Sequence, residues 1–131
     1  MEETNRISGE VVDAAIAIHR EVGPGLLESV YEVVLYHELK QRELACERQV
    51  AIAIEYRGLR FDEGYRIDLL VENRIVIEIK SIEQVNPVHK KQLLTYLRLT
   101  KHPLGLLLNF NVNLMKDGIT RIVNGINDSD R

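Results

Sequence analysis

Two neighbouring apolar runs with charged residues set among them, residues 65–81 (YRIDLLVENRIVIEIKS), constrain the fold most strongly. Because successive side chains of a β-strand point to opposite faces, each run can be read by parity. The odd positions of both runs are apolar, whereas the even positions include Asp68, Glu78 and Lys80. The pattern predicts a β-hairpin with one buried face and with polar groups at the end of the other face.

The length of the loop between the two runs determines which residues face each other. A two-residue loop would set core residues beside charged ones, whereas a three-residue loop over residues 72–74 sets Asp68 directly opposite Glu78. We therefore expect the three-residue loop, with Asn73 or Arg74 in the left-handed conformation.

Two carboxylates that face each other repel, and a bound cation relieves the repulsion. Carboxylate oxygens and water are the ligands that Mg²⁺ prefers, and Lys80 on the same face could reach an anion or a water held by the metal. The residues also leave open an edge hairpin with an ordinary salt bridge. A D/E-x-K triplet is expected about once by chance in a chain of this composition.

The length of 131 residues predicts a single domain over residues 1–131, with an ordered core over about residues 5–125 and a disordered tail at 127–131. The single cysteine, Cys46, excludes an internal disulfide and fits a reducing compartment. The sequence has neither an apolar leader nor a run of the roughly 18 to 20 apolar residues that a membrane span needs. We expect a cytoplasmic protein.

The net charge of −3 argues against a strongly basic nucleic-acid binder. It leaves open a local basic patch, because several arginines fall in the middle of the chain; scattered surface arginines are the alternative. These residues are Arg48, Arg57, Arg60, Arg66 and Arg74.

Apolar residues at helical spacing predict helices over residues 7–22 and 27–42, with Asn5 or Ser8 as the first N-cap. Gly23-Pro24-Gly25 separates them. Asn86 and Pro87 read as N-cap and first residue of a third helix that ends near Thr100. Alternation predicts a strand at 49–56, which an Arg57-Gly58 turn joins to a strand at 59–61, and further strands at 104–109 and 119–123.

The element order α-α-β-β-β-β-α-β-β predicts an α+β fold, in which helices cover one sheet. Two of the helices carry polar residues of interest. His89, Gln92 and Tyr96 are spaced i, i+3, i+7 and share one face. Glu28 stands in the first turn of its helix, where it answers the helix dipole or contributes to a site.

Five motifs of the sequence belong together: Gly25-Leu-Leu-Glu28-Ser-Val-Tyr31, Tyr65-Arg-Ile-Asp68-Leu-Leu-Val, Ile77-Glu78-Ile-Lys80, Pro87-Val-His89-Lys-Lys-Gln92-Leu-Leu-Thr-Tyr96 and Gly105-Leu-Leu-Leu-Asn109-Phe110. With them the chain resembles the GxxExxY proteins, a small family within the PD-(D/E)XK nuclease superfamily. The similarity covers roughly residues 7–123. It implies a restriction-endonuclease-like core, an α/β sandwich with a central mixed β-sheet and helices packed on it.

The resemblance also implies a site and an activity. Glu28, Asp68 and Glu78 match the residues that ligate Mg²⁺ or Mn²⁺ in the superfamily, together with a backbone carbonyl that is that of Ile79 here. Lys80 would orient or help to deprotonate the attacking water.

A helix glutamine contacts the site in related nucleases, and Gln92 matches it. Tyr31, His89 and Tyr96 match the family pattern as supporting residues without a derived role.

The implied function is metal-dependent hydrolysis of phosphodiester bonds in nucleic acid, DNA more than RNA. The alternative is a non-enzymatic module that binds nucleic acid or protein and keeps the nuclease-like fold. A homodimer is compatible with either, since two strands call for two sites, but no interface is specified by the sequence.

Overall fold

The computed structural model describes residues 1–125, and the tail predicted to be disordered, 127–131, lies outside the described residues. The described elements follow in the order α1 (Glu2–Val22), α2 (Glu28–Gln41), β1 (Cys46–Ala51), β2 (Ile54–Tyr56), β3 (Leu59–Phe61), β4 (Arg66–Val71), β5 (Ile75–Lys80), α3 (Pro87–Thr100), β6 (Leu104–Asn109), the 3₁₀ helix η1 (Met115–Gly118) and β7 (Ile119–Val123).

The main sheet has five strands in the order β1-β4-β5-β6-β7. Its neighbours are antiparallel except β5 and β6, which are parallel and are connected by the crossover helix α3. The sheet is therefore mixed, and the predicted α+β fold with a restriction-endonuclease-like layout is confirmed.

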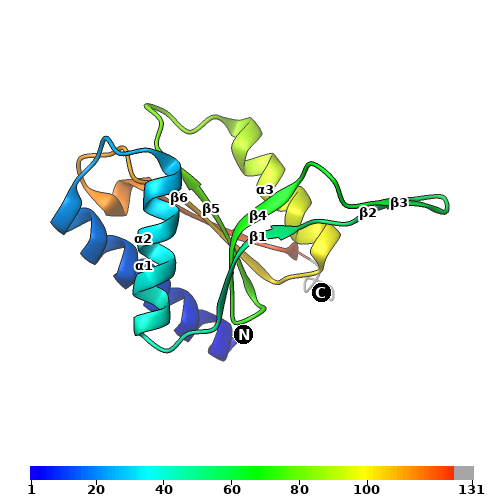
Figure 1. Cartoon of the computed structure of the whole chain (residues 1–131), viewed down its shortest axis with the longest axis horizontal. Helices are drawn as coiled ribbons and strands as arrows, with labels where there is room; N and C mark the ends of the chain where they lie inside the picture. Colours follow the sequence, from blue (N-terminus) through cyan, green and yellow to red (C-terminus); the bar gives the residue numbers. More distant parts are fainter. Residues whose placement is uncertain (126–131) are drawn as a thin grey trace.

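Helices cover both faces of this sheet, with α1 and α2 on one side and α3 on the other (Figure 1). The apolar odd-numbered side chains from Leu69 to Ile79 pack with α1 and α2. Ile67, predicted on the same face, packs on the opposite one. On the opposite face, Leu70 and Val76 pack with Leu93 of α3. The sheet is thus buried on both faces, and the polar groups of β4 and β5 stand at the margin of the α3 layer.

The β4–β5 hairpin has the predicted register, with Val71 opposite Ile75 and a three-residue loop between them. Asn73 is in the left-handed conformation with a φ of 52°, as one of the two predicted alternatives required. The second residue with positive φ is Glu72, also at 52°, and not Arg74. Two successive left-handed residues match the right-handed twist of the hairpin.

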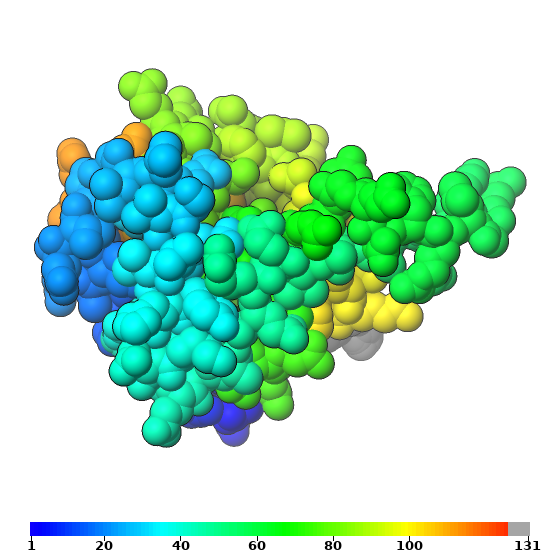
Figure 2. All heavy atoms as spheres, viewed as in Figure 1, coloured from blue at the N-terminus to red at the C-terminus, as the bar shows by residue number. Residues whose placement is uncertain are grey.

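The single strand predicted over residues 49–56 is wrong, because this stretch forms two strands in two different sheets. Gln49 has a φ of 53°, and Ile52 turns into the core under α3, where its N–H donates to the carbonyl of Tyr65 at 3.0 Å. β2 then leaves the main sheet and pairs only with β3, in a ribbon that projects from the body (Figures 1 and 2). Apolar alternation continues across the break, so periodicity alone did not reveal it.

The first helix begins at Glu2, five residues before the predicted start, and the predicted N-caps Asn5 and Ser8 lie inside it. Glu2 and Glu3 in the first turn complement the helix dipole, which extends the helix toward the N-terminus. The predicted N-cap and first residue of α3, Asn86 and Pro87, are confirmed. Within the described residues, none of the helices is both long and apolar enough to span a bilayer.

Candidate active site

Asp68 and Glu78 lie on adjacent strands where the backbone ladder between β4 and β5 stops. The last paired residues are Leu69 and Ile77, and the same register continued by one residue sets Asp68 opposite Glu78. Here side chains replace the ladder: Ile79 N–H donates to Asp68 Oδ2 at 2.8 Å, and Asp68 N–H donates to Glu78 Oε2 at 3.1 Å. Each carboxylate is therefore held in place by the neighbouring strand.

The pKa values of both carboxyl groups are raised above their ordinary values. Burial and the nearby charge of Asp68 raise the pKa of Glu78 to about 8. Burial also raises the pKa of Asp68, with a smaller contribution from Glu32. Two close, poorly solvated carboxylates disfavour full ionisation, and a nearby positive charge restores it.

Lys80 supplies one such positive charge at the end of β5. It is half-buried, and its ammonium favours the ionised form of both Asp68 and Glu78, which lowers the pKa of each. The lysine thus lies near both carboxylates, and its interaction with an anion held beside them stays a prediction from its place on the same face of the strand.

Glu28, at the first position of α2, lies next to the end of β5. Its Oε2 accepts a hydrogen bond from the N–H of Ser81 at 3.1 Å, and Ser81 Oγ donates to the carbonyl of Leu26 at 2.7 Å. The side chain is exposed, and its charge contributes to the raised pKa of Asp68. Glu28 therefore lies at the rim of the carboxylate pair, and it has a specific partner beyond the helix dipole.

Tyr31 explains how Glu28 is positioned. Its ring is fully buried and stacks on Phe110 with centroids 4.3 Å apart. Its hydroxyl donates to the carbonyl of Gly23 at 2.6 Å and accepts from the N–H of Leu26 at 3.2 Å. Tyr31 thus fastens the loop that leads into α2, a role that the sequence motif did not disclose.

Glu32 is a charged residue of the site that the sequence reasoning missed. It is buried, accepts from Arg48 Nε at 3.1 Å and from Gln49 Nε2 at 2.8 Å, and contributes to the raised pKa of Asp68. The same Gln49 amide reaches Asp68 Oδ1 at 3.5 Å. A signal was available, since Glu28 and Glu32 stand one helical turn apart on the same face.

The three predicted residues of α3 take different places. Tyr96 is buried, and its burial and then the nearby charge of Glu78 raise the pKa of its hydroxyl. Gln92 is exposed and lines a cavity of about 280 Å³ together with Tyr65 and Tyr96. His89 is used as a helix cap, since its Nδ1 accepts from the N–H of Asn86 at 3.0 Å.

Asn109, at the end of β6, holds the loop that follows Lys80. Its buried side chain accepts from the N–H of Ile82 at 3.1 Å and donates to the carbonyl of the same residue at 3.0 Å. This bidentate contact, next to the pairing of Lys80 with Asn109, defines where β5 ends.

The residues present fit a divalent cation with few protein ligands. Among the described residues there is no group of three or more His, Cys, Asp or Glu side chains that could hold a metal ion. Mg²⁺, however, is commonly bound through one or two carboxylates while it keeps several waters. Asp68 and Glu78 offer that donor set, and their raised pKa values identify a place where a positive charge is favoured.

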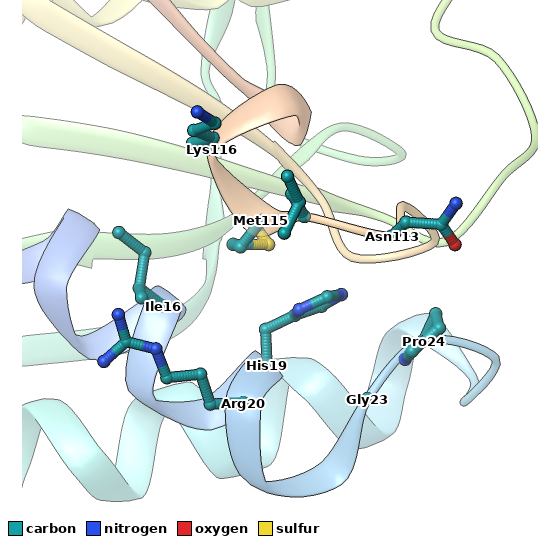
Figure 3. Close-up of a pocket in the computed structure, with 9 residues that line it drawn as sticks. Ile16, His19, Arg20, Gly23, Pro24, Asn113, Met115 and Lys116 are labelled. Atoms are coloured by element: carbon teal, nitrogen blue, oxygen red, sulfur yellow. The ribbon is translucent and has the colours of Figure 1, made fainter.

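A second pocket lies between α1 and η1 and has a volume of about 390 Å³ (Figure 3). His19 points into it, with its Nε2 2.8 Å from the carbonyl oxygen of Val112. None of the predicted site residues lines this pocket. The carboxylate pair is thus separate from it.

A family model of the PD-(D/E)XK nuclease superfamily matches residues 5–122. The chain belongs to this superfamily. Its nucleases generally use divalent metal ions, and membership points to a nuclease-type function on nucleic acid. The narrower resemblance to GxxExxY proteins stays a prediction from the motifs. Neither a curated protein nor a solved structure matches the chain significantly.

Proposed function

We propose that the protein is a metal-dependent nuclease that hydrolyses phosphodiester bonds, with DNA as its principal substrate. The observation that carries the proposal is the pair Asp68 and Glu78, held where two strands of a buried sheet stop pairing, with Lys80 beside them. Such a pair is expensive to bury unless it binds a cation.

Asp68 and Glu78 would hold Mg²⁺ or Mn²⁺, with Glu28 at the rim and the Ile79 carbonyl as further donors. The bound metal would supply a water of lowered pKa and a polarised phosphate. Lys80 would stabilise the negative charge that develops on the phosphate, since a positioned cation acts most strongly in a site with little water.

Two further side chains would support this chemistry. Glu32, buried and neutralised by Arg48, would hold Gln49 against Asp68. Gln92 would contact the substrate from the exposed side, because it lines the cavity next to Tyr96.

The test is a cleavage assay of the purified protein with Mn²⁺ or Mg²⁺ on single-stranded, double-stranded and branched DNA and RNA. Wild type should cleave at least one substrate, and the isosteric variant Asp68→Asn should cleave none. Cleavage that is the same in both proteins would come from a contaminating nuclease and would refute the proposal.

The rival function is a non-enzymatic module that binds nucleic acid or protein. The engagement of Glu28 with the backbone of Ser81 favours it. Binding of one substrate at low salt without cleavage of any substrate would decide for the module. Cytoplasmic location remains a prediction from the sequence.

A further inference from the structure

The ribbon formed by β2 and β3 has two unlike faces. Paired residues of antiparallel strands share a face, so that Ile54, Tyr56, Leu59 and Phe61 lie together. The other face carries the exposed ion pair between Glu55 and Arg60. The ribbon is therefore amphipathic although it lies outside the main sheet.

The apolar face of the ribbon is left open by the rest of the chain. The exposed fractions are 63% for Tyr56, 59% for Leu59 and 41% for Phe61, and the ribbon projects away from the body (Figure 2). A two-stranded hairpin alone is marginally stable in water, and the largest apolar patch on a monomer is often functional. We therefore expect another surface to pack against this face.

The base of the ribbon offers a matching hollow. The cavity of about 280 Å³ is lined there by Ile54, Tyr65 and Leu99, together with Gln92, Thr95 and Tyr96. Tyr65 and Leu99 are themselves exposed by 46% and 40%. One chain thus carries both an apolar projection and an apolar hollow.

Charged residues are also distributed unevenly along the ribbon. Arg57 stands at the tip, with its guanidinium 5.3 Å from the ring centroid of Tyr56. Asp62 and Glu63 are exposed at the base and make no ion pair within the described residues. The tip is cationic, and residues 62–63 of the loop at the base are anionic.

We propose that the ribbons of two copies of this chain pack with their apolar faces together and in opposite directions, in a two-fold symmetric dimer. The tip of each ribbon, Tyr56 and Leu59, then fills the hollow at the base of the other, and Arg57 of each copy meets Asp62 and Glu63 of its partner. Such an interface is self-complementary, as a two-fold axis requires.

The size of the patch agrees with a weak dimer. Partly exposed aromatic and leucine side chains amount to on the order of 400 Å² per copy. Burial of this patch on both copies, together with the polar rim around it, covers about 1,000 Å² of surface in total. This area is at the lower end for specific interfaces. A nucleic-acid partner is disfavoured, because residues 54–66 carry three arginines and three acidic residues.

The dimer also bears on the site, and this part rests on the proposed function. Gln92 and Tyr96 line the hollow that the partner's ribbon would fill, so that ribbon would form one wall beside the carboxylates. Dimerisation itself is measured without any assay of activity, and its failure is therefore distinct from failure of the nuclease proposal.

Sedimentation velocity of the wild type from low to high micromolar concentration should show a monomer–dimer equilibrium. The double variant Tyr56→Ser with Leu59→Ser should be monomeric with an unchanged circular dichroism spectrum. Two matched controls should leave the equilibrium unchanged: Glu55→Gln on the opposite face of the ribbon, and Val88→Ser at a similarly exposed apolar position on α3.

A charge exchange makes the test specific. Two charge variants are made: the single variant Arg57→Glu, and the double variant Asp62→Arg with Glu63→Arg. Each of them alone should weaken the homodimer by about tenfold or more, because like charges then meet. An equimolar mixture of these two variants should form a heterodimer tighter than either homodimer.

Three outcomes would overturn the proposal. They are a wild type that stays monomeric at every concentration, a dimer that persists in the Tyr56→Ser, Leu59→Ser variant, and a mixture of charge variants that gains nothing. Loss of duplex binding in an Arg57→Glu protein whose monomer–dimer equilibrium is unchanged would assign the ribbon to nucleic acid and is a fourth outcome that would overturn the proposal.

Discussion

The side chains of Asp68 and Glu78 replace the backbone hydrogen bonds that β4 and β5 no longer make at this point. Asp68 Oδ2 accepts from the N–H of Ile79, and Glu78 Oε2 accepts from the N–H of Asp68. The two strands thus separate without leaving backbone donors unsatisfied. The same bonds keep two carboxyl groups close together, and the predictions for metal binding and pH dependence follow from this proximity.

A divalent cation should stabilise the fold through this pair. Binding to the native state raises the free energy of unfolding by about 2.7 kcal/mol at a hundredfold excess over Kd. Thermal melts with Mn²⁺ and with EDTA measure the shift, which Asp68→Asn should abolish. The exposed control Asp117→Asn should keep it, and an equal shift in all three proteins would place the metal elsewhere.

Stability in EDTA should fall as pH rises through the range in which Glu78 ionises. The folded protein holds the Glu78 proton up to a pKa of about 8, whereas the unfolded chain loses it near the ordinary value of 4.5. Between these values the native state binds more protons, so the free energy of unfolding declines with pH, by at most about 1.4 kcal/mol per unit from this group.

Urea denaturation at several pH values checks this dependence. The slope should be smaller in Glu78→Gln, which carries no titrating proton, and unchanged in Glu83→Gln, an exposed glutamate in the following loop. Parallel stability curves for wild type and Glu78→Gln would contradict the assignment.

Lys80→Ala should separate chemistry from metal binding. The cleavage rate should fall by a factor of roughly 10² to 10⁴, the usual contribution of one positioned charge-stabilising or proton-transfer group. The Mn²⁺-dependent shift in melting temperature should persist, because the carboxylates remain. Lys91→Ala on the exposed side of α3 is the matched control, and equal losses in both variants would remove Lys80 from the mechanism.

Tyr31→Phe should destabilise the protein by about 1–2 kcal/mol, since it removes the hydroxyl that binds Gly23 and Leu26. Tyr36→Phe serves as control, because the Tyr36 hydroxyl makes no hydrogen bond in the described part of the chain. Urea midpoints compare the two. If the loop is what positions Glu28, metal affinity should also decline in Tyr31→Phe alone.

Parity was enough to predict the register of the central hairpin. Charged residues occur in both runs only at even positions, and this pattern tolerates only one alignment, so the facing of Asp68 and Glu78 followed from side-chain alternation. The start of α3 followed in the same way from a local rule, whereas the mixed sheet was implied by the resemblance to the nuclease superfamily.

What escaped prediction depends on tertiary contacts. The break between β1 and β2 occurs where Ile52 turns into the core, and its apolar neighbours gave no sign of it. The helical spacing of Glu28 and Glu32 pointed to a shared face, but the burial of Glu32 depends on Arg48 and Gln49, which β1 brings to it.

The end of backbone pairing between β4 and β5 at Asp68 and Glu78 has a consequence for amide hydrogen exchange. The N–H groups of Asp68 and Ile79 are protected by carboxylates rather than by backbone carbonyls, although the strands around them are buried. Protonation or ligation of either carboxylate weakens that protection without unfolding the sheet. The exchange rates of these two amides, which lie on neighbouring strands, would then report directly on the state of the site.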